Sequence, residues 1–149
     1  MRYILFLVII FGFIACSKET AIYYEYNETT ITRINKGNKI LFFYGKFDNE
    51  NFPEMFVEAE YSGLNSGMQA YLNFLPNKQV EIIGIMGSFE KTGIISNFNI
   101  KEIDNIRFIA WKDSIQGNYN NTIELFDVLQ IEIERNQQNN SKVKAYHPL

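Results

Sequence analysis

Residues that could carry out acid–base or nucleophilic chemistry are few in this chain of 149 residues. Glu58 and Glu60 are the best-placed carboxylates, because they alternate with Val57 and Ala59 in a run that favours a β-strand. On a strand the two carboxylates would point the same way, with their Cα atoms about 7 Å apart. Glycoside hydrolysis instead needs two carboxylates that flank a bond from opposite sides. We therefore interpret Glu58 and Glu60 as a solvated strand face.

The single histidine and the single cysteine do not offer a catalytic pair. His147 is two residues from the C-terminus and precedes Pro148, so we expect it to be an exposed tail residue. A serine–histidine–aspartate triad or a thiol–histidine pair would have to recruit this tail, and a histidine-rich metal site lacks ligands. We predict that the protein is not an enzyme and has no catalytic residue, metal site or cofactor.

The first sixteen residues have the pattern of a secretory signal peptide. Arg2 gives the leader a positive charge near its N-terminus. Residues 3–14 then form an apolar run that contains a single glycine. A transmembrane helix needs about 20 apolar residues, whereas polar residues begin here at Ser17. A buried core helix would carry a polar face, which this run lacks. The sequence therefore predicts a signal peptide over residues 1–15.

The end of this leader, Phe13-Ile14-Ala15-Cys16, resembles the lipobox of bacterial lipoproteins. The resemblance implies that diacylglycerol is attached to the thiol of Cys16 and that the signal is cut between Ala15 and Cys16. It further implies acylation of the new amino terminus, for example with palmitate. Ser17 stands where an aspartate retains enterobacterial lipoproteins in the inner membrane, so the resemblance favours the outer membrane of a Gram-negative bacterium. Two alternatives stay open: cleavage as an ordinary secreted protein, and an uncleaved anchor.

Lipidation of Cys16 would determine how the mature chain is held. The membrane would then be a partner, contacted through this lipid, since two or three acyl chains bind a bilayer firmly. Residues 16–21 would form a short lipidated tether, of which the last five residues span at most about 17 Å. No second cysteine exists, so no disulfide can form within the chain and the fold must depend on its hydrophobic core.

The composition indicates one domain of mild negative charge. Removing residues 1–15 from the 149 leaves 134 residues, the size of a single domain. Without Arg2 the chain has 13 basic and 17 acidic residues, so its net charge is −4. Proteins that bind nucleic acid carry a clustered basic surface, so we predict no nucleic-acid partner.

Short runs of strand-forming residues, separated by Gly, Asn and Pro, dominate the rest of the chain. Predicted strands cover residues 22–27, 29–34, 39–47, 55–61, 68–74, 79–85, 94–100, 106–112 and 122–134. The predicted fold class is all-β and mainly antiparallel, a single small barrel or sandwich of about eight to ten short strands over residues 22–135. Residues 136–149 are polar and are predicted to be a disordered tail.

Two stretches carry more specific predictions. Residues 55–61, 68–74 and 79–85 alternate most cleanly between apolar and polar side chains and predict an antiparallel meander with one dry face. Residues 122–134 could form an amphipathic helix or a long strand. The period of two over residues 129–134 favours the strand.

Aromatic residues are numerous in the predicted strands and could stack on sugars or line an apolar pocket. The set consists of Tyr23, Tyr24, Tyr26, Phe42, Phe43, Tyr44 and Trp111. We favour the simpler interpretation, that these rings pack the core of a strand-rich domain.

The sequence is compatible with three functions. We favour a lipid-anchored, non-catalytic envelope lipoprotein that acts as a binding or structural module and contacts an envelope protein or glycan. The first alternative is a β-barrel that carries a small apolar ligand. The second is an inhibitor or immunity protein that blocks a secreted hydrolase through a loop such as residues 48–53.

Overall fold

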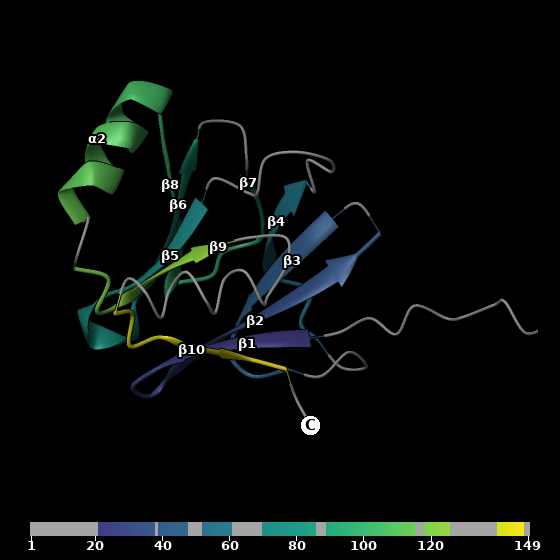
Figure 1. Cartoon of the computed structure of the whole chain (residues 1–149). Helices are drawn as coiled ribbons and strands as arrows, with labels where there is room; N and C mark the ends of the chain where they lie inside the picture. The colour runs from purple at the N-terminus through teal and green to yellow at the C-terminus, as the bar shows by residue number, and fades with distance from the viewer. Residues whose placement is uncertain are drawn as a thin grey trace, which may run out of the picture.

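The structure is a computed structural model that describes residues 21–37, 39–47, 52–60, 70–85, 89–115, 118–125 and 140–147. These residues form two β-sheets that face each other, with one α-helix on the outer side of the smaller sheet (Figure 1). The architecture confirms the predicted all-β class. Of the two predicted forms it corresponds to the sandwich, since the described strands do not close into a barrel.

The larger sheet, called sheet A, is a 6-stranded antiparallel sheet in the order β10-β1-β2-β3-β4-β7. Asn27 and Gly37 lie in the tight turns that follow β1 and β2, with φ angles of 53° and 62°. Gly and Asn adopt this left-handed conformation at low cost, so both turns suit their residues. The strands of sheet A are β1 (Ala21–Tyr26), β2 (Thr29–Lys36), β3 (Lys39–Tyr44), β4 (Phe56–Glu60), β7 (Phe89–Thr92) and β10 (Lys144–Tyr146).

The smaller sheet, called sheet B, is a 4-stranded sheet in the order β8-β6-β5-β9. Its strands are β5 (Ala70–Phe74), β6 (Val80–Ile85), β8 (Phe98–Ile103) and β9 (Thr122–Leu125). A 3-10 turn at Pro76–Lys78 joins β5 to β6, which pair antiparallel. β6 and β8 pair in parallel, because the chain crosses to sheet A to form β7 between them.

The main core fills the space between the two sheets. Sheet A contributes Ile22, Tyr24, Ile31, Ile40, Phe42, Val57, Ala59 and Phe89, and sheet B contributes Ala70, Leu72, Phe74, Val80, Ile82, Phe98, Ile123 and Leu125. These residues alternate along each strand, as a pleated strand with one face on the core requires. The predicted inward faces of residues 55–61 and 68–74 are confirmed at Val57, Ala59, Ala70, Leu72 and Phe74.

The outer face of sheet A is also apolar in part. Phe43 is fully buried there beneath Phe47 and Phe52, which lie on the chain between β3 and β4, and beside Phe56 of β4. The ring centroids of Phe43 and Phe52 are 5.1 Å apart. The chain that follows β3 therefore folds back over this face, and both faces of β3 are buried.

The predicted three-strand meander over residues 55–85 is only partly correct. β5 and β6 do form an antiparallel pair, but β4 belongs to the other sheet, where it lies between β3 and β7. The alternation in β4 and in β5 identifies a face that must be buried. It does not identify which strand is the neighbour, because both sheets direct their faces into one core.

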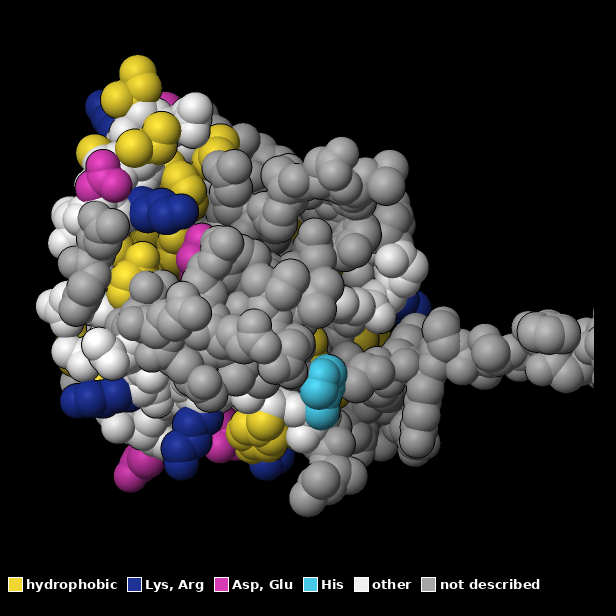
Figure 2. All heavy atoms as spheres, viewed as in Figure 1, with side chains coloured by type: hydrophobic (Ala, Val, Ile, Leu, Met, Phe, Trp, Pro, Cys, Tyr) yellow, Lys and Arg dark blue, Asp and Glu magenta, His cyan; other side chains and the backbone are white. Residues whose placement is uncertain are grey.

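The prediction of a strand at residues 106–112 is wrong, because this segment is a helix, α2 (Asn105–Ile115). The side-chain carboxylate of Asp104 accepts a hydrogen bond from the backbone N–H of Arg107 at 3.0 Å, which caps the first turn. Phe108, Trp111 and Ile115 share the face that packs on sheet B. Figure 2 shows hydrophobic side chains over the outward part of α2, where Ile106 is exposed.

Helix α2 covers Tyr71, which projects from β5 away from the main core. Tyr71 is fully buried and packs against Phe108, Trp111 and Tyr119. Burial raises the pKa of the Tyr71 hydroxyl far above its usual value, and the neighbouring carboxylate of Glu124 raises it further. Its hydroxyl has no hydrogen-bond partner among the described residues. The outer face of sheet B therefore carries a third, smaller cluster of buried aromatic residues.

Three further boundaries differ from the predictions. The strand expected at residues 94–100 is β8, which begins four residues later, after a bend at Gly93 with φ 85°. The sequence does not predict β7, because only one of its residues, Phe89, is buried and the other three are exposed and polar, so the strand has no apolar alternation. Of residues 122–134, the first four form β9, as the strand interpretation requires, and residues 126–134 lie outside the described part.

The predicted disordered tail at residues 136–149 is wrong for the part that the structure describes. Lys144–Tyr146 forms β10, which pairs antiparallel with β1, and Val143 is buried. The apolar side chains of Val143 and Ala145 explain this order, because both pack against the main core. The signal peptide, Ala15, Cys16 and all but the last residue of the tether lie outside the described residues. Among the described helices, none is long and apolar enough to span a membrane.

Candidate functional site

Glu58 lies on the outer face of sheet A, as the strand prediction implies. Its carboxylate accepts a hydrogen bond from the ammonium of Lys39 at 2.5 Å, on the neighbouring strand β3. The side chain of Glu60 lies outside the described part. His147 is exposed, and its Nδ1 lies 3.3 Å from the backbone oxygen of Ala21.

The aromatic residues singled out in the sequence do not form one cluster. Tyr24, Tyr26, Phe42 and Tyr44 face the main core, and Tyr23 and Phe43 lie on the outer face of sheet A. Trp111 lies on α2 and packs against the outer face of sheet B. Their distribution over three sites confirms the packing interpretation. One of them, Tyr26, also reaches the surface at a groove.

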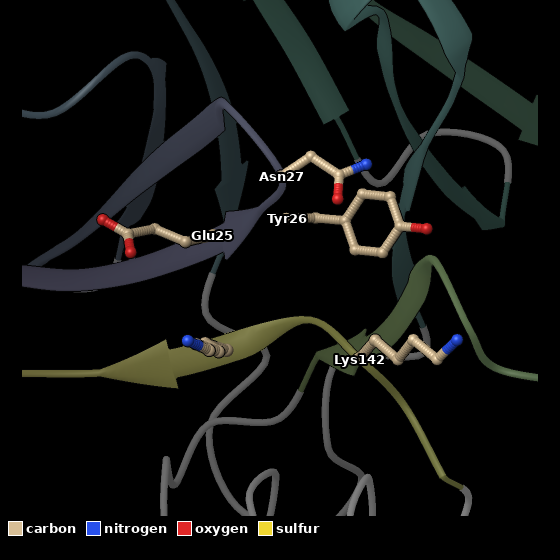
Figure 3. A pocket seen from close by; sticks show the side chains of 5 residues that line it. Glu25, Tyr26, Asn27 and Lys142 are labelled. Carbon is tan, nitrogen blue, oxygen red and sulfur yellow. The ribbon is translucent and has the colours of Figure 1, made fainter.

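This groove lies where β1 and the C-terminal segment diverge, and it has a volume of about 430 Å³. Five residues line it: Glu25, Tyr26, Asn27, Lys142 and Lys144. Figure 3 shows the ring of Tyr26 and the side chain of Lys142 extending toward one side of the groove, and Glu25 extending toward the other. The volume lies within the range of small-ligand sites, about 300–1,000 Å³.

The groove is built by segments more than a hundred residues apart in sequence. β10 pairs with β1 so that Lys144 lies directly opposite Glu25. Beyond this pair the C-terminal segment turns toward sheet B, where the backbone N–H of Lys142 donates to the backbone oxygen of Asn120 at 3.0 Å. The hydroxyl of Ser141 donates to the backbone oxygen of Thr122 at 2.7 Å. The wall formed by β1 therefore belongs to sheet A, whereas the wall formed by the C-terminal segment is held by hydrogen bonds to both sides of the sandwich.

The carboxylate of Glu25 is held in place by side chains on the outer face of sheet A. Its carboxylate accepts a short hydrogen bond from the hydroxyl of Tyr146 and lies 3.6 Å from the ammonium of Lys46. Lys46 donates to the Tyr146 hydroxyl at 3.1 Å and stands over the ring of Tyr23, 5.0 Å from its centroid. The bond to Glu25 raises the pKa of Tyr146, and the bond to Tyr146 raises the pKa of Lys46. The ammonium of Lys46 therefore compensates the charge of Glu25.

The two lysines that line the groove differ from Glu25 in their contacts. Among the described residues, neither Lys142 nor Lys144 forms an ion pair, and both are exposed. Figure 2 shows both basic and acidic side chains along the lower edge of the molecule, where β1 and β10 run in Figure 1. The groove therefore carries positive charge that no ion pair among the described residues neutralises.

The groove lies at the opposite end of β1 from the position of the tether. β1 begins at Ala21, the last residue of the predicted tether, and ends at Tyr26, which lines the groove. Five steps along a strand cover about 17 Å. In Figure 1 the start of β1 lies on the right, and the turn that follows β1 lies on the left.

Sequence reasoning placed Lys142 and Lys144 in a disordered tail and missed their role. The run from Lys142 to Tyr146 alternates lysine with Val143 and Ala145, a strand signal that is only five residues long. Its partner strand is more than a hundred residues away, so the sequence gives no local sign of the pairing.

The described residues contain no group of three or more histidine, cysteine, aspartate or glutamate side chains that could hold a metal ion. Fold and groove together define a small β-sandwich with a polar, ligand-sized recess between described residues at its edge. Comparisons with protein families, with curated proteins and with solved structures find no match.

Proposed function

We propose that this protein is a lipid-anchored, non-catalytic binding module of the cell envelope, held in the outer membrane of a Gram-negative bacterium by lipid on Cys16. The observation that carries this proposal is the placement of the groove. It opens about 17 Å along β1 from Ala21, the last residue of the predicted tether. A bilayer that holds Cys16 would lie at the other end of the strand, so the groove would face an envelope protein or glycan.

The packing between the sheets favours this function over the carrier of an apolar ligand. A carrier needs enclosed apolar space, whereas large side chains such as Phe42, Phe74 and Phe98 are buried in the middle of this sandwich. The inhibitor alternative rests on residues 48–53, of which residues 48–51 lie outside the described part. It has no structural observation in its favour.

Replacing the predicted lipid acceptor tests the anchor. In cells that express the full chain, the wild-type protein is expected in the membrane fraction, and Cys16→Ala is expected to move most of it to the soluble fraction, because the acyl chains supply the membrane affinity. Fractionation and immunoblotting measure the distribution. A Ser17→Ala variant, which keeps the cysteine, should remain in the membrane. Unchanged membrane association of Cys16→Ala would refute the lipid anchor.

Photo-crosslinking in cells tests the binding role of the groove. A photoreactive benzoylphenylalanine in place of Lys142 is expected to give a discrete adduct after irradiation, because Lys142 is exposed on the groove wall. The matched control carries the same residue in place of Lys101, which is exposed on β8 at the far edge of sheet B. Adducts at both positions, or at neither, would argue against a specific binding groove.

A further inference from the structure

We infer that the groove binds an acidic saccharide, a short glycan whose sugar rings carry carboxylates. This inference rests on the proposed role of the groove as a binding site and names the chemical class of its ligand. Three properties of the lining residues support it: positive charge that forms no ion pair with the described residues, an aromatic ring at the surface, and a polar amide beside that ring.

The charge of the groove is opposite to that of the chain. The chain has 14 basic and 17 acidic residues, so a typical surface patch is neutral or negative. Of the three charged side chains that line the groove, Glu25 is compensated by Lys46 and Tyr146 from the outer face of sheet A. Lys142 and Lys144 form no ion pair with the described residues. A ligand that carries carboxylates would supply the missing counter-charges.

The aromatic ring of Tyr26 suits a sugar better than a bare anion. Tyr26 packs on Phe74 of the main core at a centroid distance of 5.8 Å, which fixes the ring without burying all of it. A fixed, partly exposed ring offers an apolar face against which the C–H groups of a sugar can pack. The amide of Asn27 follows directly and can both donate to and accept from hydroxyl groups.

The positions of the two lysines suit a ligand of more than one sugar. Lys142 extends toward the same side of the groove as the ring of Tyr26 (Figure 3), whereas Lys144 lies opposite Glu25 in the strand register. Positive charge therefore occurs at two places along the groove. An oligosaccharide with a carboxylate on each ring could contact both lysines.

Binding of trigalacturonate to the full lipidated protein in detergent tests the inference. Calorimetry at low salt is expected to detect binding of trigalacturonate and no binding of the neutral trisaccharide maltotriose. Lys142→Gln and Lys144→Gln should each weaken binding about tenfold, as loss of a charged hydrogen-bond donor does. Lys101→Gln, which removes the same charge from β8, should change the affinity less than about twofold. Raising the salt concentration should weaken binding, because exposed charges are screened.

Several results would overturn the inference. Equal affinity for maltotriose would exclude a role for the carboxylates, and displacement of trigalacturonate by equimolar inorganic phosphate would indicate a simple anion site. Absence of trigalacturonate binding together with a protein adduct at position 142 would leave the proposed binding function intact and replace the saccharide by a protein. Absence of both would overturn the binding function as well.

Discussion

Replacing Arg33 by alanine is expected to lower the free energy of unfolding by about 3 kcal/mol. Arg33 lies in the middle of sheet A, between Ile22 on β1 and Phe42 on β3, and its side chain is fully buried. Its guanidinium donates to the hydroxyl of Tyr24 at 3.1 Å and to the side-chain oxygen of Asn35 at 2.9 Å. Alanine would remove these hydrogen bonds together with the long aliphatic stem beside Ile22 and Phe42.

Arg33→Met separates these two contributions. Methionine keeps an unbranched stem of similar length and removes the charge, whose burial is itself costly. We therefore expect Arg33→Met to cost clearly less than Arg33→Ala in urea unfolding followed by tryptophan fluorescence. Lys101→Ala on the exposed face of β8 is the control and should stay within about 0.5 kcal/mol of the wild type. A cost below about 1 kcal/mol for Arg33→Ala would contradict a structural role for the buried guanidinium.

Arg33 also shows how far strand patterns determine a fold. The run from Thr29 to Ile34 indicates a strand, and the structure contains it, but its alternation places Arg33 on the same face as Ile31. Arginine is almost always exposed, so the sequence alone favours the wrong face. The ambiguity arises because both faces of sheet A are covered, the inner one by sheet B and the outer one by Phe47 and Phe52.

The helix at Asn105–Ile115 shows the opposite case, a pattern overridden by tertiary packing. Isoleucine, phenylalanine and tryptophan favour strands, and for this reason the sequence predicts a strand at residues 106–112. The aromatic face formed by Phe108 and Trp111 gains more by covering Tyr71 on sheet B than local propensity costs. Asp104, whose carboxylate caps the helix, is a residue type that commonly precedes a helix, so the sequence does contain an indication of the helix start.

The candidate site could not be predicted, because each of its walls has an ambiguous sequence. Tyr26 and Asn27 read as a strand end and a turn, and Lys142 and Lys144 read as a polar tail. The groove exists only because β10 returns to β1 across more than a hundred residues of sequence. Long-range pairing of so short a strand depends on the burial of Val143 and Ala145, which three to five residues of alternation indicate only weakly.

Replacing Gly84 by alanine is expected to destabilise the sandwich by about 1–3 kcal/mol, the usual cost of overpacking a core. Gly84 lies on the core face of β6, and a Cβ atom there would stand 2.4 Å from Cε2 of Phe89 and 3.3 Å from two further ring atoms. Phe89 belongs to β7 in sheet A and is buried, so its ring cannot move into solvent without cost. The absence of a side chain at Gly84 is therefore what allows the two sheets to meet at this point.

A double-mutant cycle with Phe89→Leu tests this contact. Leucine is smaller than phenylalanine, so it should leave room for the new methyl group, and the cost of Gly84→Ala should fall by about 1 kcal/mol or more in the Phe89→Leu background. Urea unfolding of the four proteins measures the coupling energy. Additive costs would contradict the contact, because they would mean that the methyl group meets something other than the ring. Coupling would instead establish β7, a strand with one core residue, as the element that fixes the spacing of the sheets.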